Sequence, residues 1–396
     1  MDFNVFFTPE FFNNILSIVR QLWFLWLPFV LLFLFWEFWV VYIRTRYIKE
    51  LSWVLLEIKI PKEIEKSPRA MEAVFSALHA TREGNLIERF WQGFLTPWFS
   101  FEITSFNGVI HFFVYAQKFF KRMVESQIYA HYPDVEIAEV DDYIFNLPPN
   151  IPNEDWQAWG AEFVLTKEDA YPIKTYMDFK LEDSKEETEK IDPINSFLEF
   201  IGSLKEGEQL WFQILIKGAS DKWKETGDKL VKKLLGDKKN KKTEEAGKSG
   251  LGIMALSPGE QDAIKAIERN IAKLGFETGI RFLYFARHDI FNFINVASMM
   301  GVMKQYNTLH LNGFKPKNGT GVDYFFREKR GFRLKRRMIK AYKKRSYFYP
   351  PYKKKSFVLN AEELATIYHF PGRVAKTPTL GRVGARKGEP PPTLPV

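Results

Sequence analysis

The residues best suited to bind a ligand are basic and lie in one segment, Lys315 to Lys355. This segment holds sixteen Lys and Arg residues and only two acidic ones, with aromatic residues between them. Cations that neutralise phosphates, next to rings on which bases stack, are typical of a nucleic-acid surface. The candidate ligands for nucleic acid or anionic lipid are the cations of the densest part: Arg327, Lys329, Arg330, Arg333, Lys335, Arg336, Arg337, Lys340, Lys343, Lys344 and Arg345.

This composition also fits other ligands. Anionic lipid headgroups attract such segments, an acidic protein surface would do the same, and a solvated arm without a specific ligand is the remaining alternative. Residues 1–314 hold 36 basic and 43 acidic side chains, so the formal net charge of +9 does not come from them. The sequence therefore predicts a mildly acidic body and a distinct basic aromatic segment at residues 314–355.

No combination of residues in the sequence predicts an enzyme. The phosphate-binding pattern G-x-x-x-x-G-K-[ST] fails before Gly247, because Lys242 stands where the first glycine should be. The six histidines are scattered and none has H-x-x-x-H spacing. Cysteine is absent, which removes thiolate metal sites and cysteine nucleophiles. We therefore expect no catalytic residue, no cofactor and no metal.

Residues 22–43 are predicted to form a transmembrane helix. This apolar stretch would span about 33 Å as a helix, and the hydrocarbon core of a bilayer is about 30 Å thick. A signal peptide would end in a small-residue cleavage site, but Arg44 and Arg46 follow instead. Cations on this side place the N-terminus outside and the bulk in the cytoplasm. We expect a single-pass protein of the cell inner membrane, with residues 1–21 as an amphipathic extracytoplasmic leader.

Residues 50–145 have the element order of a ferredoxin-like unit. Apolar runs predict strands at 53–60, 99–104, 109–115 and 135–140, and helical spacing predicts a helix from Ser67 and another at 118–131. Asn107-Gly108 lies between two alternating runs and predicts a tight hairpin. The resulting order β-α-β-β-α-β is that of the split βαβ unit.

Residues 155–313 are predicted to repeat this order around an insertion. The expected strands are 162–165 or 174–179, then 209–216 and 280–286, and the expected helices are 193–204, 221–235, 257–274 and 293–306. The Lys-, Glu- and Gly-rich stretch 236–252 is predicted to be a mobile loop. The predicted fold class is thus α+β: a transmembrane helix and two ferredoxin-like units, the second with a helix-plus-loop insertion.

Residues 356–396 are predicted to form a short helix followed by an extended Pro-rich tail. The apolar face of that helix fills either the core of the chain or a groove of a partner protein. The candidate partner-binding residues are Glu362, Leu364, Ile367, Tyr368 and Phe370.

Several blocks of the sequence resemble the region ahead of the motor domain in bacterial HerA/TraG-like ATPases of conjugation and type IV secretion. They are Gln127–Asp134, Leu256–Glu260, Gly275–Arg281, Leu311–Pro316, Phe357–Pro371 and Pro390–Pro395. The chain stops at Val396, where the motor and its Walker lysine would begin, so ATP hydrolysis does not carry over. The resemblance implies a stand-alone, membrane-anchored form of this non-motor region.

The expected function follows from the anchor and the resemblance together. We expect an accessory component of a type IV secretion or conjugation-like DNA-transfer machine that docks or positions a HerA-like ATPase and has no catalysis of its own. The alternative is a membrane-tethered nucleic-acid-binding protein that acts through residues 315–355. The expected partners are the ATPase and the membrane, with DNA, anionic lipid or a second copy of the chain left open.

Overall fold

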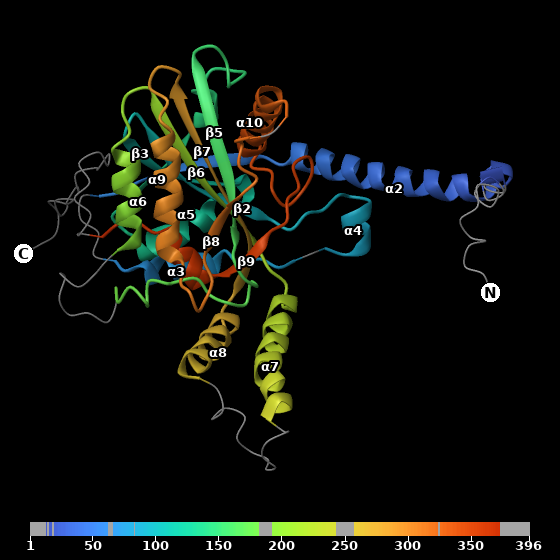
Figure 1. Ribbon diagram of the computed structural model, residues 1–396. Helices are drawn as coiled ribbons and strands as arrows, with labels where there is room; N and C mark the ends of the chain where they lie inside the picture. Colours follow the sequence, from blue (N-terminus) through green and yellow to red (C-terminus); the bar gives the residue numbers. More distant parts are fainter. Residues whose placement is uncertain are drawn as a thin grey trace, which may run out of the picture. The chain divides into compact units, whose positions relative to one another are not determined.

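A computed structural model describes residues 13, 16, 17, 20–61, 66–82, 84–181, 192–242, 257–323 and 325–372 of the 396-residue chain. The chain forms two compact units. One comprises Met1–Leu51 and Glu83–Leu95, and the other comprises Ser52–Arg82 and Thr96–Val396. We call the second unit the body; it contains the sheet and the helices that cover it (Figure 1).

The body is built on one nine-stranded sheet in which all paired strands are antiparallel. The strand order is β4-β1-β3-β2-β6-β7-β5-β8, and β9 pairs with β7. The strands are β1 (Trp53–Lys59), β2 (Trp98–Phe106), β3 (Val109–Gln117), β4 (Glu136–Val140), β5 (Trp156–Leu165), β6 (Glu208–Gly218), β7 (Gly275–Arg287), β8 (Phe314–Lys317) and β9 (Phe357–Asn360).

The prediction of two ferredoxin-like units is wrong. Strands β2 and β6 pair from Trp98 opposite Lys217 to Phe106 opposite Gln209, which joins the two predicted halves into a single sheet. One hydrophobic core also includes residues of both halves, such as Phe101 and Ile280. Both faces of β2 and β6 are buried, and backbone pairing between them leaves neither strand as an edge.

Several local predictions agree with the structure. Strands β2 and β3 form the expected hairpin, and Asn107 and Gly108 both have positive φ, at 53° and 84°, as a tight two-residue turn requires. The helix predicted to begin at Ser257 is α8 (Pro258–Ile271), and Ser257 and Glu260 form its capping box. The first strand of the second half is β5, which begins at Trp156 and is longer than the predicted 162–165.

Helices cover both faces of the sheet. Residues of α3 (Pro68–Ala77), α5 (Lys121–His131), α6 (Pro193–Gly202), α9 (Phe293–Met303) and α11 (Ala361–Ile367) pack into the large core on one face. Residues of α10 (Arg327–Lys343) and the short 3-10 helix η3 (Tyr143–Phe145) pack on the other face. The alternation of strand residues explains this division, because Val54 and Leu56 of β1 belong to the first core and Leu55 to the second.

Helices α7 (Lys222–Lys242) and α8 pack against each other through a smaller apolar cluster that includes Val231 and Ile267. The predicted loop at 236–252 needs correction, because residues 236–242 continue α7. The rest of that predicted loop lies outside the described residues, as do most of the predicted leader and the Pro-rich tail after residue 372.

The other unit is dominated by α2 (Trp23–Glu50), a helix of 28 residues that is long and apolar enough to cross a membrane. Its side chains between Leu31 and Phe38 are exposed, so α2 is not a core helix of this chain. The predicted span at 22–43 therefore lies on a single continuous helix that extends past it into Arg44 and Lys49. The unit also contains α4 (Leu86–Phe90).

Candidate functional site: a cationic helix

The basic segment forms α10, a helix with an apolar row and a cationic row on opposite sides. Gly331, Met338 and Tyr342 are buried, and they follow one another at about two-turn and one-turn intervals. Since a helix advances 100° per residue, the cations two places after these residues lie on the opposite face. Met338 and Tyr342 at i and i+4 are a helix signal that was available in the sequence.

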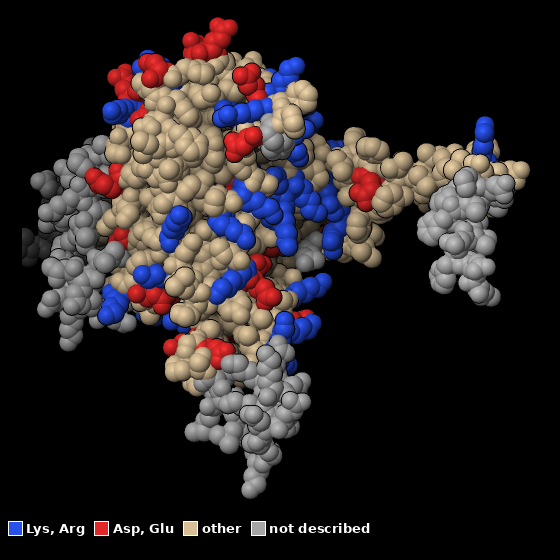
Figure 2. Space-filling view, in the orientation of Figure 1, with Lys and Arg blue, Asp and Glu red and all other residues tan. Residues whose placement is uncertain are grey.

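Most of the candidate cations lie on the exposed face of this helix. Arg330, Arg333, Arg337, Lys340 and Lys344 recur every three or four residues and are exposed, so they form one row. We call these five residues the cation row; it extends over about 21 Å at 1.5 Å per residue. In Figure 2 Lys and Arg side chains gather over the part of the body where Figure 1 shows α10 and the chain that follows it.

The remaining candidate cations differ in exposure. Arg327 and Lys329 are exposed at the start of α10, whereas Lys335, Arg336 and Lys343 are half-buried. Lys335 Nζ donates a hydrogen bond of 2.7 Å to Gln157 Oε1, and Arg336 Nη2 donates one of 2.7 Å to Asn150 Oδ1. These side chains hold the helix on the body as well as adding positive charge.

Arg345 does not belong to the surface that the sequence predicted. Only 2% of the residue is exposed, and its guanidinium makes a double contact with the buried carboxylate of Glu102, at 3.0 and 3.1 Å. It also pairs with Asp142 and lies 4.1 Å from the ring centroid of Tyr115. Arg345 therefore joins the end of α10 to β2 and to the segment after β4, and it is unavailable to an external ligand.

The charges in this buried cluster stabilise each other. Burial disfavours the Glu102 carboxylate, but the charge of Arg345 and the hydrogen bonds from Ser100 and Tyr143 outweigh burial and lower the pKa of Glu102. Burial likewise opposes the charge of Arg345, but Glu102 and Asp142 hold the pKa of its guanidinium above the ordinary value. The pair is therefore ionised at neutral pH.

A second buried arginine holds the carboxyl end of α10. Arg281 of β7 donates to the carbonyl oxygens of Ala341 and Ser346, at 2.9 and 3.1 Å, and its Nε donates to Gln213 Oε1 at 2.6 Å. Helix carbonyls in the last turn lack partners within the helix and attract cations. Burial lowers the pKa of Arg281 to about 10, which leaves it charged at neutral pH.

Neither Glu102 nor Arg281 is among the site residues predicted from the sequence. Each stands as a lone charge within an otherwise apolar strand run, FSFEIT and IRFLYFA. A charge in a strand that is buried on both faces needs a partner, which is the signal that could have revealed them. Arg345, the partner of Glu102, lies in a segment where so many cations occur that none stands out.

A glycine allows α10 to lie close to the sheet. A Cβ atom on Gly160 of β5 would come within 2.8 Å of Met338 Sδ. The neighbouring Thr320 donates its backbone N–H to Gly160 O and accepts the Gly160 N–H on Oγ1, at 2.9 and 3.0 Å. The chain before α10 is thus attached to β5, and the helix packs directly on that strand.

The aromatic residues of the basic segment divide into two groups. Tyr342, Tyr347 and Phe348 are buried and serve the core. Phe325 and Phe326 are 86% and 74% exposed just before the first turn of α10, and Phe332 is 43% exposed within it. Of these six rings, those of the second group are exposed to a ligand, and they lie at the amino end of the cationic helix.

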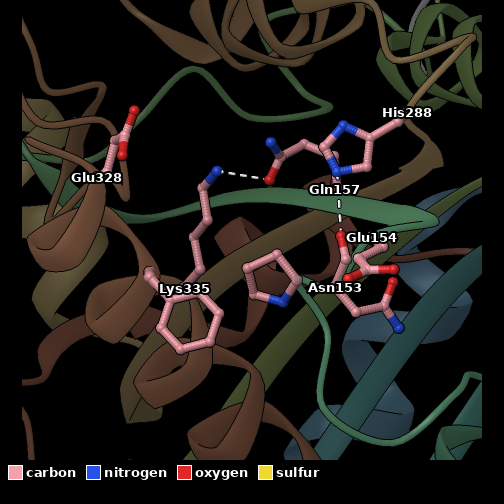
Figure 3. A pocket seen from close by; sticks show the side chains of 8 residues that line it. Asn153, Glu154, Gln157, His288, Glu328 and Lys335 are labelled. Atoms are coloured by element: carbon pink, nitrogen blue, oxygen red, sulfur yellow. Dashed lines mark hydrogen bonds between the residues drawn. The ribbon is translucent and has the colours of Figure 1, made fainter.

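A hollow of about 410 Å³ adjoins the amino half of α10. Figure 3 shows Lys335 and Glu328 of the helix on one side and Asn153, Gln157 and His288 on the other. Burial lowers the pKa of Lys335, whose amine faces Gln157. His288 Nε2 lies 3.1 Å from the carbonyl oxygen of Asn153. The hollow offers hydrogen-bond donors and acceptors beside an exposed ring, Phe332, which also lines it.

A second cavity, of about 250 Å³, lies beside the carboxyl half of the helix. Arg337 of the cation row lines it together with Lys354 and the buried Glu162. Lys354 Nζ lies 3.1 Å from Glu162 Oε2, and Asn318 donates to the same oxygen. Lys354 is thus neutralised, whereas Arg337 is exposed at the edge of the cavity.

The predicted partner-binding residues lie inside the chain. Glu362, Leu364, Ile367, Tyr368 and Phe370 are each at most 3% exposed. Tyr368 lies in a cluster of rings with Phe101 and Phe112, and Glu362 pairs with Lys273 at 2.6 Å. The short helix α11 therefore fills the core of its own chain, and we do not propose it as a docking surface.

The described residues contain no group of three or more His, Asp or Glu side chains arranged to hold a metal ion. No curated protein matches the chain. A family model, Domain of unknown function (DUF8128), matches residues 46–382, which include the whole described body and the cationic helix. The chain therefore belongs to the DUF8128 family.

Proposed function

We propose that this chain is a membrane-tethered protein that binds single-stranded nucleic acid through the exposed face of α10. The observation that carries the proposal is the cation row, five Lys and Arg side chains on one face of a helix whose opposite face is fixed in the body. Such a surface neutralises successive phosphates without first having to fold, so little ordering free energy opposes binding.

The cation row lowers the stability of α10, and a feature that destabilises the fold is expected to serve binding. Like charges three or four residues apart on a helix destabilise it by about 0.2–0.5 kcal/mol per pair. The carboxylates of Glu102 and Asp142, near the carboxyl end of the helix, pair with the buried Arg345. The arrangement leaves the outer face cationic.

The exposed rings favour a single strand over other polyanions. Phe325 and Phe326 lie at the amino end of the row, and unpaired bases stack on such rings. A duplex offers no unstacked base, and an acidic protein surface has no need of flat rings. The hollow beside Lys335 adds hydrogen-bonding groups at the same end.

The tether in this proposal is α2. Its length and its exposed apolar surface support a single membrane span, and Arg44, Arg46 and Lys49 at its end support a cytoplasmic position for the body by the positive-inside rule. A nucleic-acid surface on the body would then face the cytoplasm. The accessory role beside a HerA-like ATPase in DNA transfer rests on sequence resemblance alone and stays a prediction.

The test is binding by the full chain in nanodiscs of zwitterionic phosphatidylcholine. Fluorescence anisotropy is measured with a labelled dT oligonucleotide and with a duplex of equal length, over a series of salt concentrations. We expect the single strand to bind, and the triple variant Arg333→Glu, Arg337→Glu, Lys340→Glu to lose at least tenfold in affinity. Its slope of log K against log salt falls by about 2, because each phosphate contact contributes about 0.7.

A matched control is available on α7, where Lys229, Lys232 and Lys233 are exposed. Reversing these three changes the net charge by the same amount, and we expect less than a threefold loss. Equal losses in both triple variants would contradict a site on α10, as would the absence of binding. Phe325→Ala separates the ligands further: it weakens binding of the single strand but not of the duplex. Binding only to added phosphatidylglycerol vesicles would overturn the nucleic-acid proposal in favour of a lipid surface.

A further inference from the structure

The segment between α3 and β2 leaves the body and packs on the membrane helix. Residues 83–95 belong to the same compact unit as α2, although they lie in the middle of the body's sequence. The short helix α4 lies at the tip of this segment, and Asn85 and Glu88 cap it reciprocally. In Figure 1 α4 lies beside the part of α2 nearer its carboxyl end. We call residues 84–95 the α4 loop.

The contacts between the α4 loop and α2 follow one face of the helix. The rings of Phe90 and Trp36 are 5.6 Å apart, and those of Phe94 and Tyr47 are 6.0 Å apart. Trp39 Nε1 also donates a hydrogen bond of 3.0 Å to Phe90 O. The tip of the loop therefore lies closer to the middle of α2 than its base does.

A glycine fixes this approach. Gly93 has φ of +74°, and a Cβ atom there would lie 2.6 Å from the carbonyl oxygen of Ile43. Any side chain would both strain the backbone and push the loop away from α2. The close contact between the α4 loop and α2 therefore requires glycine at position 93.

The tip lies at the level of the apolar part of α2. Trp36 and Trp39 precede the end of the apolar stretch, Ile43, by about 6–10 Å at 1.5 Å per residue. Residues at this depth from the end of a span meet the boundary of headgroups and acyl chains, where Trp is favoured. The loop that touches both Trp residues reaches the same level.

The α4 loop also carries exposed apolar side chains. Leu86, Ile87 and Trp91 are 72%, 63% and 63% exposed. The ring of Trp91 also lies 5.7 Å from that of Trp39, so the exposed apolar surface of the loop adjoins that of α2. Exposure of these apolar side chains to water is unfavourable, whereas their burial in a bilayer interface is favourable.

We infer that the α4 loop lies in the membrane interface beside α2 and forms a second lipid contact of the chain. The inference rests on the proposed membrane tether, because the exposed apolar surface of the loop continues that of α2. It adds that the body is attached to the bilayer at two places in the sequence, through α2 and through the loop between α3 and β2. A protein partner for the same apolar face is the alternative that the experiment must distinguish.

Nitroxide accessibility tests this in the full chain. The protein has no cysteine, so single-cysteine variants can be labelled without removing native residues. The sites are Ile87→Cys and Leu86→Cys in the loop, Leu32→Cys in the exposed middle of α2, and Glu199→Cys on the exposed side of α6. Each variant is reconstituted into phosphatidylethanolamine vesicles containing phosphatidylglycerol, and collisions with oxygen and with a water-soluble nickel chelate are measured by EPR.

We expect both loop sites to collide with oxygen and to be shielded from nickel, as at Leu32, with a shallower depth than Leu32. The control site at Glu199 should show the opposite pattern, with frequent collisions with the water-soluble nickel chelate. If the loop sites match Glu199 while Leu32 is in lipid, the inference is overturned and the tether stands. If the loop sites are shielded from both reagents, a protein covers them, which also overturns it. A water-accessible Leu32 would instead refute the tether.

Discussion

Helices α10 and α11 both contain residues that the sequence offered as candidates for binding, and the structure gives the two helices opposite surroundings. α10 keeps five cations on an exposed face, whereas none of the five partner-binding candidates on and after α11 is more than 3% exposed. Both helices are amphipathic in sequence. The two helices differ in which of their faces the rest of the chain covers. The sequence of one helix alone does not contain this information.

Charge and apolar surface in a sequence carry unequal information about binding. Cations cannot be buried without partners, so the sequence predicts that most cations of a dense basic segment are exposed, but not which ones. An apolar face is equally suited to a core and to a groove. The one cation of the basic segment that is deeply buried, Arg345, is the one for which the body supplies two carboxylates.

The largest effect is expected from removing that cation. Arg345→Met leaves Glu102 charged and without its main partner at a site that is fully buried, so we expect a loss of about 3–5 kcal/mol in the free energy of unfolding. Denaturant unfolding in detergent measures it. The neighbouring exposed cation gives the control: Lys344→Met should change stability by less than about 0.5 kcal/mol.

A second substitution distinguishes a lost ion pair from lost packing. If the loss in Arg345→Met comes from the orphaned carboxylate, adding Glu102→Gln recovers part of the stability. No recovery in the double variant would mean that the guanidinium matters through its contacts with Tyr115 and the end of α10.

For α11, truncation of a buried side chain tests whether the helix serves the core. Leu364 is completely buried, so Leu364→Ala should cost about 2–5 kcal/mol in the free energy of unfolding. The matched leucine on α10, Leu334, is 39% exposed, and its replacement by Ala should cost about 1 kcal/mol or less. Equal costs at the two leucines would contradict the contrast between the helices.

The elements of the body were largely predictable, but their assembly was not. Alternation in FSFEIT and VIHFFVY, with Asn107-Gly108 between them, determines β2 and β3 and their hairpin locally. The pairing of β2 with β6 joins residues about one hundred positions apart, and no local pattern encodes which strands become neighbours. The same limit applies to α11, because its apolar face matches a core whose other walls are distant in sequence.

The candidate site was predictable as a segment and not as a surface. The count of cations located α10, but their division into an exposed row, half-buried anchors and the buried Arg345 depends on strands that the segment does not contain. The rings are divided in the same way, since Tyr342 packs on Trp211 of β6 while Phe325 is 86% exposed. The α4 loop escaped sequence analysis because its contact is with α2, far from it in the chain.

Two buried carboxyl groups, Glu102 of β2 beside the end of α10 and Glu363 of α11, should respond in opposite directions to pH. The folded state lowers the pKa of Glu102, so this group adds stability above the unfolded pKa of about 4.3, and that stability is lost as pH falls through the folded value. Burial raises the pKa of Glu363 in α11 to about 8 from 4.5. Stability from Glu363 is therefore present below pH 4.5 and is lost as pH rises to about 8.

Urea unfolding between pH 5 and pH 8 tests the predicted pH dependence of the stability that Glu363 contributes. We expect the wild type to lose stability over this window more than Glu363→Gln does, because glutamine does not ionise. The exposed Glu199→Gln serves as the control and should follow the wild type. If Glu363→Gln and the wild type have the same pH dependence, the two backbone N–H groups that Glu363 accepts, from Asn360 and Ile173, keep it ionised throughout.

The smallest effect concerns the cation row and has the opposite sign to the others. Arg337 has a cation of the row four residues before it and another three residues after it, so Arg337→Gln removes two repulsive pairs. We expect the free energy of unfolding to rise by a few tenths of a kcal/mol, while affinity for the dT oligonucleotide falls about two- to fivefold. Unfolding at low and high salt measures the first effect, and the gain should disappear at high salt because screening removes the repulsion. If the cation row serves binding, the substitution should raise the free energy of unfolding and lower the affinity for the ligand. A decrease in both quantities would show that Arg337 stabilises the body, as Arg345 does.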